Sequence, residues 1–229
     1  MKFSLLIITL FWTYSGIGNP TADNVIGAWK NDSGILVFSE HYFSYTEFTP
    51  TEYKFTYGGE WILGDGQLTF SYEYHTGNPE KVGTEDRQKA KINGEKLTIG
   101  ETSFYLLDNG TPGKLANAWL FYNRIRDGQP GTPREASNSR KTMKILSGTR
   151  FQWIAYNTET KEFSGTGGGT YTTIDGKYTE NIDFFSRDNS RVGASLQFDF
   201  EIKDDEWHHK GLSSRGDPIY EIWKLRTVK

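Results

Sequence analysis

The most constraining feature of this sequence is an internal repeat. Residues 58–69 align without a gap with residues 168–179, so that their Gly-Gly and Asp-Gly pairs coincide at an offset of 110 residues. The same offset pairs Leu97 with Trp207 and, extended backwards, Leu36 with Leu146 and Phe43 with Trp153. Solenoid repeats recur every 20–50 residues or so, and this unit is far longer. We therefore expect two copies of one domain.

Each copy is predicted to consist of β-strands. Apolar residues alternate at Leu68, Phe70, Tyr72 and Tyr74, which is the period of a strand with one buried face. In the second copy, eight strands are expected near residues 116–124, 142–147, 150–157, 162–173, 177–185, 194–203, 206–212 and 218–226. Short strands joined by hairpins favour an up-and-down barrel, because closure removes the edge strands. The expected fold is all-β, with two tandem eight-stranded antiparallel barrels.

The domain boundary follows from a change in the offset. Trp29 matches Trp119 at an offset of only 90, so the second copy holds about 20 additional residues before Ile145. Residues 123–140 are rich in Pro, Gly and Ser, and we expect them to form a loop inserted in the second domain. The predicted domains are residues 23–110 and residues 114–229, joined by a short linker.

Composition and the first residues restrict the class of protein. The chain has no cysteine, which excludes disulfides and thiol chemistry, and its net charge of −3 gives no indication of nucleic-acid binding. Residues 1–18 combine Lys2, an apolar run and small residues, the pattern of a secretory signal peptide. That run is shorter than the roughly 20 residues that span a bilayer. We expect a secreted or periplasmic protein with no transmembrane segment in the mature chain.

The first strand of each copy carries a family resemblance. Gly27-Ala28-Trp29 resembles the Gly-x-Trp pattern of lipocalins and other calycins, and Asn117-Ala118-Trp119 departs from it at the glycine. In that family the Trp closes the barrel floor and a basic residue near the last strand packs across it, so the resemblance implies Lys224 or Arg226 as the partner of Trp119.

The second copy also resembles an uncharacterised lipocalin-like family of secreted bacterial proteins. The segments that carry this resemblance are Phe151–Trp153, Gly167–Tyr171, Lys177–Glu180, Phe184–Asp188 and Trp207–His209. It implies the fold and a location outside the cytoplasm, and it brings no activity and no site residues.

Comparison of the copies predicts two polar residues inside the second barrel. Glu180 replaces Phe70, and His209 replaces Ile99. A position that is apolar in one copy is expected to face the interior in both, and a buried polar group needs a partner. Glu180 and His209 either hold a polar group of a ligand, pair with each other as a structural feature, or lie at a rim position open to water. The aromatic residues expected around such a ligand are Tyr178, Phe184 and Trp207.

Other candidate residues have less specific patterns. Arg187 and Arg191 occupy a hairpin loop, where they either bind a carboxylate or phosphate at the barrel mouth or form a solvated turn with Asp188. The adjacent His208 and His209 should point to opposite faces of a strand, so no shared metal site is expected. No nucleophile motif accompanies Glu180 and His209, and no catalytic residue, metal or cofactor is assigned.

Three functions remain open. The leading hypothesis is a lipocalin-like protein that binds a small, partly apolar ligand in the second barrel. The alternative is a non-enzymatic module that binds a protein or cell-envelope partner through loops, above all the 123–140 loop. The third is an enzyme in which Glu180 and His209 act as acid and base. The interior near Glu180 separates the first two, because a cavity of roughly a few hundred Å³ favours a ligand.

Overall fold

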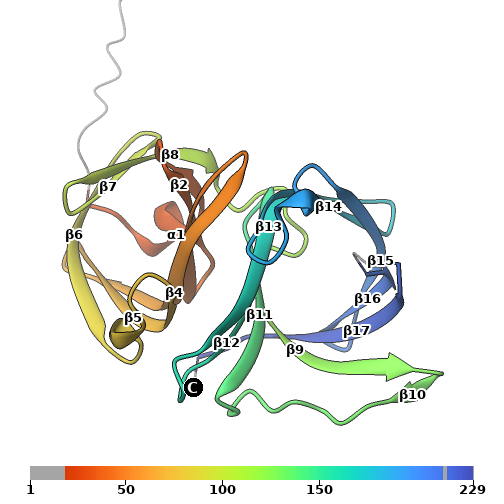
Figure 1. Cartoon of the computed structure of the whole chain (residues 1–229). Helices are drawn as coiled ribbons and strands as arrows, with labels where there is room; N and C mark the ends of the chain where they lie inside the picture. The colour runs from red at the N-terminus through yellow and green to blue at the C-terminus, as the bar shows by residue number, and fades with distance from the viewer. Residues whose placement is uncertain (1–18, 214–215, 229) are drawn as a thin grey trace, which may run out of the picture.

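Two closed antiparallel β-barrels of eight strands each lie side by side, as the repeat predicts (Figure 1). The computed structural model describes residues 19–213 and 216–228, and the predicted signal peptide lies outside these residues. The first barrel follows the short helix α1 (Ala22–Val25). Its elements are β1 (Gly27–Lys30), β2 (Gly34–Phe38), β3 (Tyr42–Thr49), β4 (Glu52–Gly64), β5 (Gln67–His75), the 3₁₀ turn η1 (Pro79–Lys81), β6 (Glu85–Asn93), β7 (Lys96–Ile99) and β8 (Thr102–Asp108).

The second barrel has the same strand order. Its elements are β9 (Asn117–Arg126), β10 (Gln129–Pro130), β11 (Arg140–Leu146), β12 (Arg150–Asn157), β13 (Phe163–Ile174), β14 (Lys177–Phe185), the 3₁₀ turn η2 (Asn189–Arg191), β15 (Ser195–Lys203), β16 (Glu206–Leu212) and β17 (Pro218–Leu225). The barrel closes because β9 pairs with both β11 and β17. All eight strands expected in this copy are present. Among the described residues, no helix is long and apolar enough to cross a bilayer.

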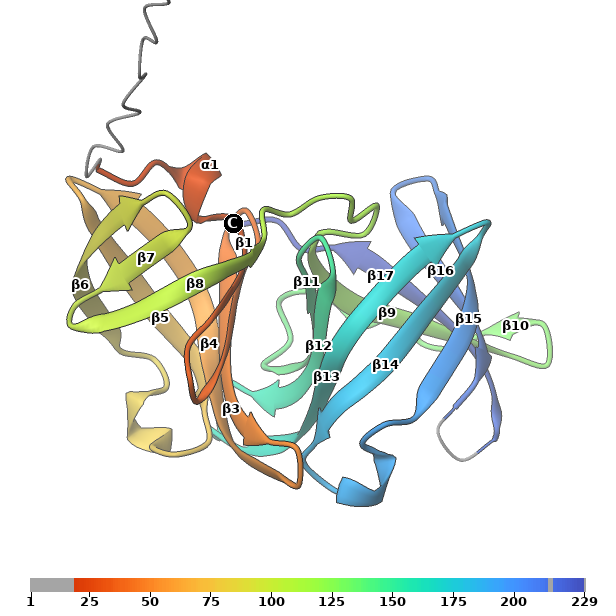
Figure 2. The same cartoon turned by 90° about the horizontal axis from the view of Figure 1, so that it is seen from above.

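The inserted segment is only partly the loop that the sequence predicts. Residues 123–126 continue β9, and β10 pairs back onto β9 to form a hairpin. The hairpin and the chain that follows it, residues 123–134, are called the arm below. The arm projects from the second barrel on the side away from the first (Figures 1 and 2). Backbone pairing explains the difference, because a hairpin satisfies amide groups that an open loop would leave to solvent.

The first barrel is filled by its own side chains. Aromatic rings from several strands, among them Trp29, Phe43, Trp61 and Phe70, form one buried cluster, in which the centroids of Phe43 and Phe70 are 4.5 Å apart. The Trp29 indole donates a hydrogen bond of 2.8 Å to the Val25 carbonyl and so attaches α1 to one end of the barrel. Trp119 makes the same bond, at 2.9 Å, to the Leu115 carbonyl. The two tryptophans are therefore equivalent despite the missing glycine before Trp119.

A β-bulge lies opposite the Gly58-Gly59 pair of the first barrel. Gly59 pairs with Tyr72 and Gly58 pairs with Tyr74, so Glu73 is an additional residue in β5. A Cβ atom on Gly59 would lie 2.0 Å from a backbone carbonyl oxygen of β5, which leaves room only for glycine. The additional residue reverses the alternation of the strand, so Tyr74 faces away from the barrel interior.

The outward-facing residues of the bulge belong to a seam between the barrels. Figure 2 shows β3 and β4 of the first barrel beside β11, β12 and β13 of the second. One buried apolar cluster crosses this boundary and contains Ala28, Val37, Tyr42, Tyr74, Ala118, Leu120, Met143, Ile145, Ile154 and Tyr156. The centroids of the Tyr74 and Tyr156 rings are 4.8 Å apart. The seam gives the two barrels a common core, in addition to the core of each barrel.

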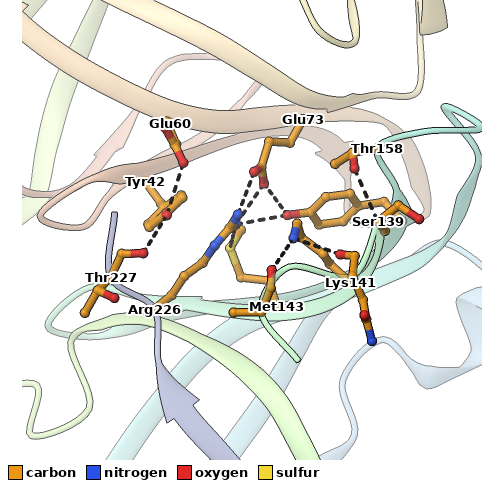
Figure 3. Close-up of polar contacts among 12 residues, drawn as sticks. Tyr42, Glu60, Glu73, Ser139, Lys141, Met143, Thr158, Arg226 and Thr227 are labelled. Carbon is orange, nitrogen blue, oxygen red and sulfur yellow. Dashed lines mark hydrogen bonds and ion pairs between the residues drawn. The ribbon is translucent and has the colours of Figure 1, made fainter. Parts of the chain in front are cut away.

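Arg226, which follows β17, is buried in the seam (Figure 3). Its Nη1 and Nη2 donate to the two carboxylate oxygens of Glu73 at 2.8 and 2.5 Å, and Nη1 also donates to the Tyr156 hydroxyl at 3.0 Å. The expectation that Arg226 or Lys224 packs across Trp119 is therefore wrong. Arg226 crosses to the first barrel because the bulge places a carboxylate there, and Lys224 pairs with Glu206 at 3.2 Å.

We expect acid to weaken the seam. Burial raises the pKa of Glu73, but the charge and hydrogen bonds of Arg226 and the Tyr156 hydroxyl lower it below its usual value of 4.5. A lowered pKa means that the stabilisation is complete above about pH 4.5 and is lost as the pH falls through the folded-state pKa. The free energy of unfolding, measured by urea denaturation, should therefore fall as the pH drops below about 4.5, and fall less in Glu73→Gln.

Glu80→Gln is the matched control for that experiment. Glu80 is an exposed partner of Lys161, 3.1 Å away, on the same side of the first barrel as the seam. Loss of the Glu80 charge should leave the pH dependence of the free energy of unfolding equal to that of the wild type. Equal pH dependence in the wild type and Glu73→Gln would show that the Glu73 carboxylate contributes nothing.

Candidate ligand-binding site

The second barrel has an open cavity of about 1280 Å³. Strands β9, β11, β12 and β14–β17 contribute to its wall, and exposed residues of the arm line it as well. Pockets for drug-sized molecules have volumes of roughly 300–1,000 Å³. The cavity therefore has room for a small molecule without rearrangement of the barrel.

The second copy lacks two aromatic rings that the first barrel has in its interior. Backbone pairing makes Tyr57 equivalent to Gly167 and Phe55 equivalent to Gly165. In the first barrel the Tyr57 ring packs against Tyr45, with centroids 5.2 Å apart, and against Phe55, with centroids 6.2 Å apart. In the second barrel the side chains of Phe185, Trp153 and Arg187 occupy the space beside these two glycines, with atoms 2.5–2.7 Å from where a Cβ would lie, and all three line the cavity.

A buried ion pair lies in the wall of the cavity. Lys144 on β11 and Glu180 on β14 both line the cavity, with the Lys144 Nζ 2.8 Å from Glu180 Oε1. The two residues are only 4 % and 5 % exposed. The Lys144 ammonium also lies 4.9–5.3 Å from the ring centroids of Trp207, Tyr178 and Trp223. A cation in such an aromatic environment gains cation–π stabilisation in addition to the ion pair.

A second polar group lies on β16, β17 and β9. His209 Nδ1 is 3.6 Å from Glu221 Oε2, and the Arg124 guanidinium pairs with the other oxygen of Glu221. Burial, followed by the positive charge of Lys144, lowers the pKa of His209. Burial raises the pKa of Glu221, but His209, Lys144 and Arg124 lower it to about 2. At neutral pH this group therefore has a carboxylate, a guanidinium and a neutral imidazole.

The structure places four of the predicted site residues at the cavity. Glu180, His209, Arg187 and Arg191 line it. Glu180 and His209 do not pair with each other, because Lys144 and Glu221 are their respective partners. At the edge of the barrel, Arg187 donates to the Ser164 carbonyl at 2.6 and 2.9 Å, and Arg191 lies 3.5 Å from Asp188. Tyr178 and Trp207 are fully buried behind the cavity wall, where they surround Lys144.

Phe184 does not face the cavity, which corrects its assignment to the ligand site. Gly169 pairs with Ile182 and Gly168 pairs with Phe184, so Asp183 is an additional residue in β14. This bulge reverses the alternation of β14, and Phe185 lines the cavity in place of Phe184. Phe184 instead packs in the seam, with its ring centroid 4.8 Å from that of Phe48 in the first barrel.

Lys144 was not predicted, because the offset of 110 residues does not extend to β2 and β3. Trp29 pairs with Leu36, and Trp119 pairs with Lys144, so Leu36 and Lys144 are equivalent at an offset of 108. The predicted pairings of Leu36 with Leu146 and of Phe43 with Trp153 are therefore wrong by two residues. With the correct register, the comparison that identified Glu180 and His209 would also have identified Lys144.

His208 points away from the cavity, as the adjacent positions predict. Its Nδ1 is 2.8 Å from the Tyr220 hydroxyl. Within residues 19–213 and 216–228, no three His, Asp or Glu side chains gather in the geometry of a metal site. The buried polar residues of the cavity lining thus include two ion-paired groups, Lys144 with Glu180 and Glu221 with Arg124 and His209.

A search of known protein families finds none that matches this chain, and a search of curated proteins finds no similar sequence.

Proposed function

We propose that this protein binds a small, partly apolar molecule in the cavity of its second barrel. The observation that carries the proposal is the contrast between a filled first barrel and a hollow second barrel of the same strand order. An apolar wall with a few placed polar groups is the usual composition of a ligand site. The buried charged groups here include the Lys144–Glu180 pair and the group of His209, Glu221 and Arg124.

The finer proposals are a lipocalin-like relationship and export from the cytoplasm. Two eight-stranded antiparallel barrels, each with a tryptophan bonded to the segment before its first strand, support the relationship. Export rests on the composition of residues 1–18. The alternative function, a module that binds a protein or envelope partner through its loops, has less support. That function would be favoured by a second barrel filled with side chains, but the second barrel has a cavity, and residues of the inserted arm line it.

The binding proposal predicts one site per chain for an apolar fluorescent probe. N-phenyl-1-naphthylamine is uncharged and should bind with a stoichiometry near one, measured by fluorescence titration. Ala194→Trp places a large ring at a cavity-lining position and should weaken binding about tenfold or more, because the ring occupies ligand volume.

The chain provides a matched control at the equivalent position of the first barrel. Thr84 is exposed and lies 110 residues before Ala194, so Thr84→Trp adds the same ring outside the cavity. Its probe affinity should equal that of the wild type. Absence of binding in the wild type, or equal binding in both tryptophan variants, would refute the proposal. Thermal unfolding of both variants checks that each is folded.

A further inference from the structure

The charges that line the cavity are not balanced. Six cations and four carboxylates line it; the carboxylates are Glu180, Glu221, Asp188 and Asp217, and the first three each pair with a cation at the site. Arg126, Arg134 and Arg187 also line it. Within the described part of the chain, these three arginines make no ion pair with a carboxylate. Their positive charges are available to a ligand, whereas the negative charges of those three carboxylates are already matched.

Two arginines meet on one aromatic ring of the cavity wall. The guanidinium carbons of Arg134 and Arg124 lie 4.8 and 6.0 Å from the centroid of the Phe121 ring. The backbone amide of Arg134 donates to the Tyr122 carbonyl at 2.7 Å, which fixes the arm against β9. Partial burial lowers the pKa of Arg134, and the positive charges of Arg140 and Arg124 lower it further, whereas the Glu221 carboxylate opposes them and raises it. A bound anion would relieve this repulsion.

The buried polar atoms near this ring are hydrogen-bond donors without acceptors. Arg124 Nε and Trp223 Nε1 are both buried and have no hydrogen-bond partner among the described residues. Both residues line the cavity, and the Trp223 ring lies edge-on to Phe121 with centroids 5.6 Å apart. Arginine and indole N–H groups can only donate. A buried donor without an acceptor costs free energy, which a ligand oxygen would recover.

Lys144 does not compete for an anion, because Glu180 neutralises it at 2.8 Å. The cavity lining also has apolar side chains, among them Ile182, Leu196, Phe198 and Ile219. The cavity therefore combines a region of unmatched positive charge with an apolar surface.

We propose that the cavity selects an amphipathic organic anion, whose acid group binds between Arg124 and Arg134 at the Phe121 ring and whose apolar part lies along the wall. This inference rests on the proposed function and specifies the class of ligand. It also assigns a role to the arm, which brings Arg134 to β9.

The test compares three amphipaths that share one dodecyl chain: dodecanoate, dodecanol and dodecyltrimethylammonium. Each competes with N-phenyl-1-naphthylamine for the full chain, below its critical micelle concentration. Dodecanoate should compete about tenfold more strongly than dodecanol, because charge-assisted hydrogen bonds exceed neutral ones. The cation should compete least. Added salt should reduce the advantage of dodecanoate and leave dodecanol unchanged, because it screens exposed charges.

The variants Arg134→Gln and Arg87→Gln locate the effect. Arg134→Gln should remove most of the preference for dodecanoate over dodecanol, measured as the ratio of their competition constants within that variant. Arg87 is an exposed arginine of the first barrel, 70 % exposed, and Arg87→Gln should leave this ratio unchanged. Equal competition by dodecanoate and dodecanol, with the probe still bound, overturns this inference alone. A preference that survives in Arg134→Gln overturns the assigned position, and failure of the probe to bind refutes the proposed function and this inference together.

Discussion

Substitution of Lys144 by leucine should destabilise the folded protein by about 3–5 kcal/mol, because it leaves the Glu180 carboxylate buried without its cation. Leucine is the residue at the equivalent position of the first barrel, Leu36, so the change introduces no foreign shape into this fold. The measurement is the free energy of unfolding from urea denaturation at neutral pH. Lys54→Leu is the control, because Lys54 pairs with Glu52 at an exposed position and its loss should have a small effect.

The duplication also suggests a second substitution that should restore the stability lost in Lys144→Leu. Lys144→Leu combined with Glu180→Phe reproduces the Leu36 and Phe70 residues of the first barrel. Apolar residues that replace a whole buried ion pair are often as stable as the pair or more stable. We expect the double variant to recover the stability lost in the single one. A double variant as unstable as Lys144→Leu would mean that the loss reflects packing and not an unpaired charge.

Arg226→Met should cost a similar amount, about 3–5 kcal/mol, because Glu73 and the Tyr156 hydroxyl lose their common partner in the seam. Methionine retains much of the apolar length of arginine and removes its charge. Because the loss depends on a charged Glu73, it should shrink as the pH falls and Glu73 takes up a proton. Urea denaturation at neutral and acid pH tests both statements.

Two further variants make the Arg226 prediction specific. Lys224→Met removes an exposed cation two residues earlier and should have a far smaller effect. Glu73→Gln introduced together with Arg226→Met removes the unpaired carboxylate and should recover part of the lost stability. A loss in Arg226→Met no larger than that in Lys224→Met would show that the seam does not depend on this ion pair.

Much of the fold could be predicted because local and repeated patterns agree. Alternation at Leu68, Phe70 and Tyr72 identifies a strand with one buried face, and the repeat supplies the same strand a second time. The pairing of Glu180 with Phe70 predicts a buried carboxylate, and Glu180 is 5 % exposed. These inferences need only the period of a strand and the chemistry of burial.

The errors arise where one additional residue changes the register. The bulge at Asp183 turns Phe184 toward the seam, although a regular strand would place it with Ile182. The connection between β12 and β13 is longer than that between β3 and β4, which shifts the equivalence of β2 and β11 by two residues and concealed Lys144. The Gly-Gly pairs indicate a bulge only after the strand pairing is known.

The pairing of Glu73 with Arg226 depends on how the two barrels pack. The two residues are separated by 153 positions, and each lies on a different barrel. No periodicity links them, so the sequence contains no pattern from which this pairing could be inferred. The same holds for the meeting of Arg124 and Arg134 on Phe121, which depends on the path of the arm along β9.

Strand β11 gives the two barrels a common wall. Lys144 faces the cavity, whereas its neighbours Met143 and Ile145 face the seam, where the Met143 sulfur accepts a hydrogen bond of 3.1 Å from Arg226. A ligand that shifted the backbone of β11 at Lys144 would also shift Met143 and Ile145, against which the first barrel packs. By thermodynamic reciprocity, a partner that binds the first barrel and shifts β11 changes the affinity for the ligand by the same factor by which the ligand changes the affinity for the partner. Through this coupling, the first barrel would be the surface on which a partner detects whether the cavity is occupied.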